Sequence, residues 1–387
     1  MSTFINRGEK KVIALYLPQF HTIPENDKWW GTGFTEWTNT KKATPLFEGH
    51  YQPKTPLNEN YYDLSDVTVM EHQADMAKKY GVYAFCYYHY WFKNGKKLLE
   101  KPIENMLKNP KVDIPFCLCW ANENWSKNWD GGNREVIMEQ DYGTKRDWEK
   151  HFLYLLAFFK DPRYIIIENK PLLVIYKPEQ INKLNAMIDY WRKRCREEGF
   201  DGIVIVRQFP NSMYDPNFDD SRIDYSVKFE PASTQAYRHY CINKKPYLVP
   251  GRKENIKRII KSLLPKEIVE KTRRHPAEQK LTIEYYDDAW DIILNQEPCN
   301  DKLINGAFVD WDNTARNVNG RMYLGASPQK FKKYMTALLK KESALDLIFI
   351  NAWNEWAEGA YLEPDEKYQY AYLEALREAI VTAGETK

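Results

Sequence analysis

Short hydrophobic runs recur along the chain, separated by polar stretches or by stretches with helical spacing. An unbroken run of roughly four to eight apolar residues bounded by turn residues is typical of a parallel strand covered on both faces. The run Leu347–Ile350 is the clearest case. We predict eight such strands, at residues 12–17, 82–87, 114–119, 172–176, 202–208, 225–230, 303–309 and 347–350, with a short partner strand at 165–167.

Apolar residues at intervals of three and four predict helices between most of these strands. Ser65 is a candidate N-cap for a helix that ends at Gly81. Ser327 and Pro328 are the expected cap and first residue of another, with Phe331, Met335 and Leu338 as its apolar stripe. Further helices are expected near 98–108, 145–160, 179–198 and 366–382.

The alternation of strands and helices predicts a parallel α/β architecture. Eight strands favour a closed (β/α)8 TIM barrel over an open doubly wound sheet. The chain of 387 residues is longer than a minimal barrel, and a long N-terminal loop at 18–64 and an insertion at 231–283 after the sixth strand lengthen it. We therefore expect a single (β/α)8 domain over residues 1–387.

Charge and hydropathy exclude some classes of partner. The net charge of +2 gives no basic field for nucleic acid, and no apolar run approaches the roughly 20 residues that span a bilayer. Within the insertion, residues 244–280 hold 12 Lys or Arg against 4 Asp or Glu. We interpret this segment as solvated helices, with contact to an anionic polymer or a lipid surface as the alternative.

The start of the chain and its cysteines bear on location and cofactors. The first ten residues lack the apolar centre of a signal peptide, so we expect a soluble, cytoplasmic protein, although a trimmed chain would look the same. No H-E-x-x-H motif, C-x-x-C pair or zinc spacing is present, so no metal or cofactor is predicted. The cysteines are expected to be reduced and buried: Cys86, Cys117, Cys119, Cys195, Cys241 and Cys299.

The segments that follow the predicted strands are rich in aromatic rings, carboxylates and amides. All strand C-termini of a barrel face one rim, so these segments are expected to meet there. Ten of the 13 tryptophans lie in them or in the long N-terminal loop. A sugar stacks its C–H faces on rings and needs polar partners for its hydroxyls, which favours a carbohydrate ligand. The alternative is that the rings pack loops against the barrel mouth.

Glu355 and Glu358 form the best candidate pair for glycoside chemistry. That chemistry needs a proton donor for the departing oxygen and a second carboxylate at the sugar ring. Both glutamates follow the last strand and are flanked by Trp353 and Trp356, and Gly359 permits a sharp turn after them. Burial beside tryptophan would raise the pKa of one carboxyl and suit it to the acid role. Solvated surface charge is the alternative.

Other polar residues at the strand ends have two interpretations each. His89 is either a ligand or acid, or a histidine that packs or donates a structural hydrogen bond. Glu123 either contacts sugar or braces its loop. Asp310 and Asp312 bind either sugar hydroxyls or a cation.

Several motifs resemble a known family. The segment Asn354–Gly359 resembles the N-E-W-x-E-G signature of the endo-α-mannosidase family of retaining glycoside hydrolases, and Trp311–Arg316 with Asn319–Arg321 is similar to its W-x-x-x-x-T-R-N-x-x-G segment, with a shift near Thr314. The segments Leu17–His21, Trp29–Trp37 and Trp120–Trp125 resemble the related WbsX branch more closely. That branch is found with polysaccharide gene clusters and is usually labelled a glycosyltransferase.

The resemblance implies a (β/α)8 barrel and a retaining mechanism without a covalent enzyme intermediate. A carboxylate takes the proton of the sugar's 2-hydroxyl, which closes onto the anomeric carbon as an epoxide. By position, Glu355 is the implied base and Glu358 the acid/base at the glycosidic oxygen. The predicted substrate-binding residues are Tyr16, His89, Trp91, Trp120, Asn122, Glu123, Trp125, Asp310, Trp311, Arg316, Asn354 and Trp356.

The prediction is therefore a hydrolase of α-linked oligosaccharides or polysaccharides. The alternatives are a glycosyltransferase of cell-surface polysaccharide synthesis and a sugar-binding protein without turnover. A D-x-D pair, which nucleotide-sugar transferases usually carry, occurs at a strand end only as Asp310-Trp-Asp312. The sequence specifies neither the sugar and its linkage nor the oligomeric state.

Overall fold

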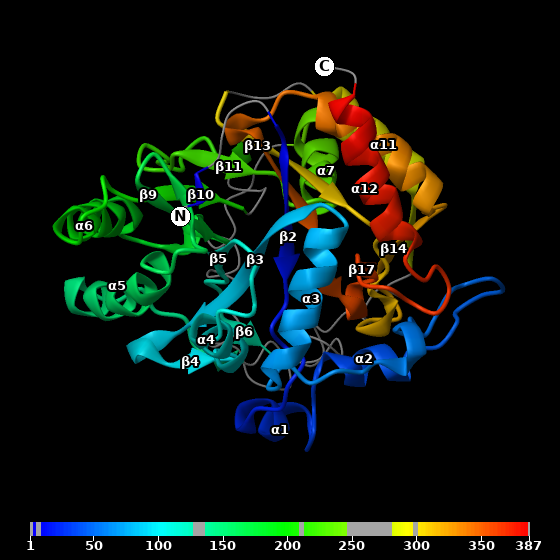
Figure 1. The fold of residues 1–387 in the computed structure, drawn as a ribbon, viewed down its shortest axis with the longest axis horizontal. Helices are drawn as coiled ribbons and strands as arrows, with labels where there is room; N and C mark the ends of the chain where they lie inside the picture. The colour runs from blue at the N-terminus through cyan, green and yellow to red at the C-terminus, as the bar shows by residue number, and fades with distance from the viewer. Residues whose placement is uncertain are drawn as a thin grey trace, which may run out of the picture.

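Eight parallel strands close into a barrel with helices around it (Figure 1). This computed structural model describes residues 3–4, 9–126, 136–208, 213–245, 281–296 and 301–385. The barrel strands are β2 (Lys11–Tyr16), β3 (Val82–Trp91), β5 (Phe116–Trp120), β9 (Lys170–Ile175), β10 (Val204–Arg207), β11 (Tyr225–Val227), β13 (Leu303–Phe308) and β15 (Leu347–Asn351). Each strand pairs with the next in this order, and β15 pairs back with β2, which confirms the predicted TIM barrel.

Helices connect most of the strands on the outside of the barrel. The longer ones are α3 (Val67–Lys79), α4 (Lys101–Lys108), α5 (Lys145–Phe159), α6 (Leu184–Glu197), α10 (Tyr286–Asn295), α11 (Pro328–Lys340) and α12 (Ala371–Gly384). The helices α5 and α6 lie side by side, as do α11 and α12 (Figure 1). The described part of the connection from β10 to β11 contains no α-helix.

The core forms because the strands are apolar on both faces and each helix is apolar on one. All five residues of β15 are buried, as are those of β5, so neither strand has a polar face. In α11 the predicted stripe Phe331, Met335 and Leu338 is buried in the hydrophobic core. The barrel therefore has a packed interior, and its strand ends carry the loops.

The N-terminal loop predicted at 18–64 contains two short helices, α1 (Pro24–Trp30) and α2 (Glu36–Lys42). Both lie at the end of the barrel toward which β2 runs (Figure 1). Sequence periodicity missed them because a helix of two turns contains too few apolar repeats to be distinguished from a loop. The N-cap of α3 is Asp66, which accepts a hydrogen bond from the Thr68 amide, so the prediction of Ser65 was wrong.

Small elements complete the described chain. The short strands are β1 (Thr3–Phe4), β4 (Lys97–Leu98), β6 (Trp125–Ser126), β7 (Val136–Met138), β8 (Ile165–Ile167), β12 (Thr282–Tyr285), β14 (Arg321–Leu324), β16 (Asn354–Glu355) and β17 (Ala360–Tyr361). The predicted partner strand at 165–167 is β8, which pairs antiparallel with β9. The predicted last helix begins at Ala371, later than expected at 366.

Most of the predicted insertion at 231–283 lies outside the described residues, and so does Cys299. The described part holds α7 (Ala232–Tyr237) and a π-helical turn at Arg238–Ile242. Four of the described cysteines are buried, but Cys241 is exposed, so its predicted burial was wrong.

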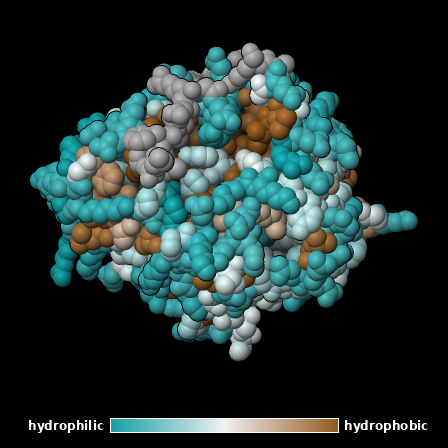
Figure 2. Space-filling model, viewed as in Figure 1, coloured by the Kyte–Doolittle hydropathy of each residue, from teal (hydrophilic) through white to brown (hydrophobic). Residues whose placement is uncertain are grey.

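The surface in Figure 2 is largely hydrophilic, with the most extensive group of hydrophobic residues at the upper right of the view and smaller groups elsewhere. No helix among the described residues has both the length and the apolarity that a membrane crossing requires.

Candidate active site

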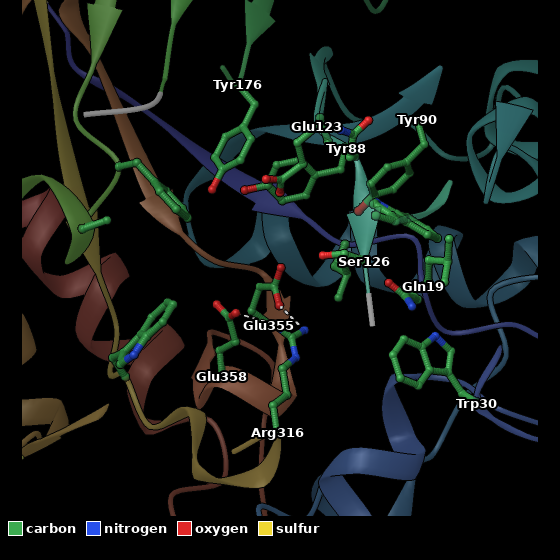
Figure 3. A pocket seen from close by; sticks show the side chains of 18 residues that line it. Gln19, Trp30, Tyr88, Tyr90, Glu123, Ser126, Tyr176, Arg316, Glu355 and Glu358 are labelled. Carbon is green, nitrogen blue, oxygen red and sulfur yellow. Dashed lines mark hydrogen bonds and ion pairs between the residues drawn. The ribbon is translucent and has the colours of Figure 1, made fainter. Parts of the chain in front are cut away.

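A cavity of about 500 Å³ opens at the C-terminal end of the barrel. Among the described residues, seven of the eight strands contribute, either from their last residues or from the segment that follows. This volume is within the range of small-molecule sites. The lining residues are Leu17, Gln19, Trp30, Tyr88, Tyr90, Ala121, Glu123, Asn124, Trp125, Ser126, Ile137, Tyr176, Phe229, Ala232, Trp311, Arg316, Glu355 and Glu358 (Figure 3).

The segment after β15, which carries both glutamates, is hydrogen-bonded to the end of β2 and to the residue that follows it. The amide of Trp353 donates to the Leu15 carbonyl at 2.7 Å, and the Asn354 side chain bonds both the amide and the carbonyl of Leu17 at 2.8 and 3.0 Å. Residues 354–355 and 360–361 then pair as the hairpin β16–β17. Glu355 therefore lies in the first strand of the hairpin and Glu358 in its turn.

Gly359 allows the turn between these glutamates and β17. Its φ is 64°, and a Cβ there would lie 3.0 Å from the amide nitrogen of Asp312. That close approach lets the Asp312 amide donate to the Glu358 carbonyl at 2.7 Å. The last strand segment and the segment after β13 are thereby joined, and glycine is required on both conformational and steric grounds.

The guanidinium of Arg316 contacts both Glu355 and Glu358 (Figure 3). Its Nη1 donates to Glu358 Oε1 and its Nη2 to Glu355 Oε2, the latter at 3.2 Å. Glu36, the first residue of α2, places Oε2 3.0 Å from the same Nη2 and accepts from Nε at 3.3 Å. One guanidinium thus contacts three carboxylates, of which Glu355 and Glu358 line the cavity and Glu36 does not.

The two cavity glutamates hold protons more tightly than exposed ones. Burial, then the charge of Glu358, raises the pKa of Glu355 to about 8, although Arg316 opposes the shift. Burial likewise raises the pKa of Glu358 against the attraction of Arg316. Two buried carboxylates that share one cation do not both ionise readily, so the pair retains a proton near neutral pH.

Aromatic rings form the walls around these carboxylates. Trp30 comes from α1, Tyr88 and Tyr90 from β3, Trp125 from β6, and Tyr176, Phe229 and Trp311 follow β9, β11 and β13. The ring of Trp125 meets those of Trp29, Tyr90 and Phe92 edge to face. Apolar ring faces beside carboxylates are suited to a ligand that has both C–H faces and hydroxyls.

Six predicted site residues line the cavity: Glu123, Trp125, Trp311, Arg316, Glu355 and Glu358. Glu123 also forms an ion pair with Lys177. Asn122 is fully buried and fixes this arrangement, because its side chain accepts from the Lys177 amide at 2.7 Å and donates to the Lys177 carbonyl at 2.8 Å. Glu123 is therefore braced by Lys177 and also lies on the cavity wall, and its contact with sugar stays a prediction.

Tyr16, Asn354 and Trp356 do not line the cavity, so direct substrate contact is not supported for them. They belong to a buried polar network behind the hairpin. Glu363 accepts from Trp356 Nε1 at 2.7 Å and from Tyr62 at 2.8 Å, and Gln73 links Glu363 to Tyr16 at 2.6 and 2.5 Å. Side chains at strand ends point alternately to either face, and sequence alone does not give that direction.

His89, Trp91 and Trp120 also lie outside the cavity lining. The Nε2 atoms of His89 and His151 are 2.9 Å apart, and the Trp91 ring stacks on His151 at 4.6 Å. Burial lowers the pKa of His89 to about 3, so its imidazole is neutral. The packing interpretation of His89 fits this environment, because the ring is almost fully buried between the barrel and α5.

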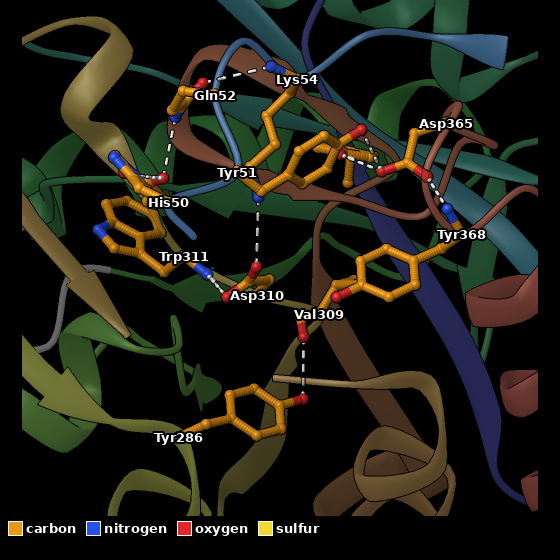
Figure 4. A network of polar contacts seen from close by, with 12 residues as sticks. His50, Tyr51, Gln52, Lys54, Tyr286, Val309, Asp310, Trp311, Asp365 and Tyr368 are labelled. Carbon is orange, nitrogen blue, oxygen red and sulfur yellow. Dashed lines mark hydrogen bonds and ion pairs between the residues drawn. The ribbon is translucent and has the colours of Figure 1, made fainter. Parts of the chain in front are cut away.

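Asp310 and Asp312 do not line the cavity, although Trp311 between them in sequence does. Figure 4 shows the carboxyl of Asp310 facing Lys54. Asp312 accepts from Gln52 and Thr314 at 2.9 and 2.6 Å and bonds His50 at 2.9 Å. Asp310 pairs with the buried Lys54 at 3.5 Å. These protein partners join the loop at 50–54 to the rim, and no group of three or more candidate ligands in the described residues could hold a metal ion.

Sequence reasoning missed several cavity residues, among them Trp30, Tyr88, Tyr90 and Tyr176. It also missed the buried Glu36, which contacts Arg316 but does not line the cavity. The tyrosines belong to or adjoin strands that were interpreted as core. Glu36 was noted only as part of the tryptophan-rich segment 29–37. A carboxylate between two large apolar residues, Phe34 and Trp37, is the one signal that could have indicated its burial.

Comparison with known proteins gives three kinds of match. A family model described as Glycosyltransferase WbsX matches residues 12–376. The protein WxcX from two strains of Xanthomonas campestris pv. campestris, described as uncharacterized, is 36% identical over 379 residues, which cover 96% of this chain. The chain spans about half the length of these curated relatives, 50% by the same alignment.

Among solved structures, a GH99 endo-α-mannosidase from Bacteroides thetaiotaomicron matches over 97% of both chains, with a TM-score of 0.53 and 12% identity. A protein described as glycoside hydrolase-like matches over 97% of this chain and 95% of its own, with a TM-score of 0.54 and 13% identity. At such identities the likeness establishes a shared barrel fold alone.

Proposed function

This chain belongs to the WbsX family, and from that premise we propose that it is a retaining glycosidase that cleaves α-linked glycans with Glu355 and Glu358. The observation that carries the proposal is the placement of both carboxyls, bridged by Arg316, in one aromatic-walled cavity. α-Mannosidic linkages are the first to test, because a structural neighbour is described as an endo-α-mannosidase.

The paired carboxyls suit a mechanism that needs one acid and one base at the same pH. In the proposed first step Glu355 accepts the proton of the sugar's 2-hydroxyl. The O2–C1 bond forms while the bond from C1 to the leaving oxygen breaks, and Glu358 gives its proton to that oxygen. A pair that shares one proton near neutrality supplies both states, and the first step starts from the form in which Glu358 carries that proton and Glu355 is ionised.

The second step opens the epoxide and restores the enzyme. Water attacks C1, Glu358 accepts a proton from that water, and the O2–C1 bond breaks as Glu355 returns its proton to O2. Both substitutions at C1 invert, so the anomeric configuration is retained over the cycle. The aromatic walls limit the access of further water and strengthen the charge interactions inside the cavity.

Transfer from a nucleotide sugar is the second candidate, because the family description names a glycosyltransferase. The charges on the cavity wall favour hydrolysis. Among the described lining residues the charged ones are Glu123, Arg316, Glu355 and Glu358, and Arg316 already contacts three carboxylates. A diphosphate would meet a predominantly acidic wall, which disfavours its binding.

The deciding experiment incubates wild type, Glu355→Gln and Glu358→Gln with a panel of α-linked glycans and reads products by mass. We expect wild type to release sugar and both variants to lose at least about 100-fold in kcat. Glu358→Gln should spare aryl glycosides with good leaving groups, and 2-deoxy substrates should resist wild type. The exposed Glu374→Gln is the matched control and should keep full activity.

Three outcomes contradict parts of the proposal. Equal loss on good and poor leaving groups removes the acid role of Glu358, and ready cleavage of a 2-deoxy sugar removes the base role of Glu355. Binding of glycan by all forms without product supports a non-catalytic binding protein. Product formed only when a nucleotide sugar is added supports the transferase.

A further inference from the structure

Three carboxylates converge on Arg316, and the proposed mechanism uses only two of them. The third, Glu36, lies 280 positions before Arg316 in sequence and comes from a different part of the rim. Its carboxyl is fully buried and does not line the cavity. Glu36 therefore does not act on substrate directly, and its effect on the reaction passes through Arg316.

The contacts of Glu36 hold Arg316 in place. The Oε2 atom meets both Nε and Nη2 of Arg316, so the plane of the guanidinium is fixed from behind while Nη1 and Nη2 face Glu358 and Glu355. The other oxygen, Oε1, is buried and has no hydrogen-bond partner among the described residues. A buried, half-satisfied carboxylate costs free energy, which a purely structural role would not require.

The backbone that carries Glu36 is itself firmly anchored. The Glu36 amide donates to the Gln19 carbonyl at 3.1 Å, and Thr35 forms a capping box with Thr38. The next residue, Trp37, donates from Nε1 to the Tyr62 carbonyl at 2.8 Å and lies 5.5 Å from the Trp356 ring. The position of Glu36 is thus tied to the hairpin that bears the two cavity glutamates.

We propose that Glu36 is a positioning residue that orients Arg316 between Glu355 and Glu358 and whose charge keeps one proton on that pair. The inference rests on the proposed glycosidase function and adds a residue that sets its proton balance. With all three carboxyls ionised the cluster would hold three negative charges against one positive charge. Since the cluster is buried, retention of a proton relieves that excess.

The other polar groups around the pair do not supply a compensating charge. Tyr88 and Tyr90 face it from β3 and Tyr176 from the end of β9, and burial raises the pKa of each phenol, so all three stay neutral. Arg316 and Glu36 are therefore the charged groups next to the pair among the described residues. Removal of the Glu36 charge should lower the pKa of the pair in two ways. It ends the repulsion between Glu36 and the pair, and it leaves more of the Arg316 charge to stabilise the ionised pair.

The test titrates the pair directly in full-length protein labelled with ¹³C at the glutamate side-chain carboxyl carbons. The signals of Glu355 and Glu358 are assigned by their loss in Glu355→Gln and Glu358→Gln. In Glu36→Gln, which keeps an oxygen acceptor for Arg316, the pair should release its proton about one to two pH units lower than in wild type. The exposed Glu48→Gln, from the same N-terminal segment, is the matched control and should titrate as wild type.

Glu36→Asp provides a second variant that keeps the charge and fits the same space. Its pair should titrate within about half a unit of wild type, and a shift as large as that expected for Glu36→Gln would overturn the charge argument. A Glu36→Gln pair that titrates as in wild type and in Glu48→Gln would also overturn the proposal. The titration needs no substrate, so its result is independent of whether glycan cleavage is found.

A kinetic measurement then connects this residue to turnover on whichever glycan is cleaved. The high-pH limb of kcat/KM, at which the acid loses its proton, should move down in Glu36→Gln by the same one to two units as the titration. A merely structural residue would lower the melting temperature and leave that limb in place, which would overturn the inference.

Discussion

Glu363 is a single buried carboxyl that makes the stability of the fold depend on pH. It accepts hydrogen bonds from Trp356, Tyr62 and Gln73 and is almost fully buried behind the hairpin. Burial raises its pKa to about 7 in spite of these donors. The folded protein therefore binds a proton here that the unfolded chain releases above its ordinary pKa near 4.5.

The stability of the folded protein therefore depends on pH, and Glu363→Gln should reduce that dependence. A carboxyl whose pKa is raised by folding stabilises fully below the unfolded pKa, and that contribution is lost as pH rises from about 4.5 to about 7. In wild type the free energy of unfolding falls between pH 4 and pH 8. In the variant this fall should be smaller by roughly 3 kcal/mol. Urea unfolding at pH 4 and pH 8 measures the free energy of unfolding at each pH, with the exposed Glu374→Gln as control. If Glu363→Gln shows the same change between the two pH values as wild type, the assignment is contradicted.

At this scale the sequence predicted the two cavity glutamates but not their neighbours. Glu355 and Glu358 follow an unbroken apolar strand, so chain direction alone places them at the rim. The contact between Glu36 and Arg316 could not be predicted, because the two residues are 280 positions apart and only the tertiary fold brings them together. Tyr16, Asn354 and Trp356 were near the rim in sequence, yet their side chains turn into the network behind it.

The helix α3 shows why element boundaries are harder to predict than elements. Its apolar face, with Met70, Ala74 and Ala77 buried, was evident from spacing. Ser65 and Asp66 are both good N-cap residues, and only the backbone geometry selects Asp66, whose side chain accepts from the amide and hydroxyl of Thr68. Likewise β3 continues to Trp91, so residues expected in a loop extend the strand into the cavity wall.

Substitution of the cap should therefore separate the two candidates. Asp66→Ala should lower the free energy of unfolding by about 1 kcal/mol, because the Thr68 amide at the start of α3 loses its acceptor. Ser65→Ala, one position earlier, should change it by less than half of that, since no cap bond involves its hydroxyl. Denaturant unfolding of both variants tests the assignment, and the reverse order of effects would reject it.

For the whole molecule, closure of the barrel depends on a close approach between β11 and β13. Gly306 in β13 lies against the backbone of Lys228, which follows β11, and a Cβ at Gly306 would lie well under 3.0 Å from the Lys228 carbonyl. Backbone atoms cannot give way as a flexible side chain can. The alternation of strands and helices predicted eight strands, whereas this contact depends on the register of the closed sheet, which a periodic pattern does not contain.

Gly306→Ala should therefore destabilise the entire barrel. We expect a loss of about 3 kcal/mol or more in unfolding free energy, as for overpacked cores with no room to relax. Gly384→Ala, at the end of α12 with open space around its Cβ position, is the matched control and should be neutral. Thermal or urea unfolding distinguishes the two, and an unperturbed Gly306→Ala protein would show that the strands separate more easily than the structure indicates.

A single connection, residues 17–81 between β2 and β3, brings both Trp30 and Glu36 to the rim. If relatives exchange this segment, the ring on the cavity wall and the carboxylate that contacts Arg316 are therefore exchanged together. Under the proposed function, sequence changes within this one segment would alter both the glycan that the cavity accepts and the pH at which Glu355 and Glu358 share their proton, while the hairpin after β15 stays unchanged.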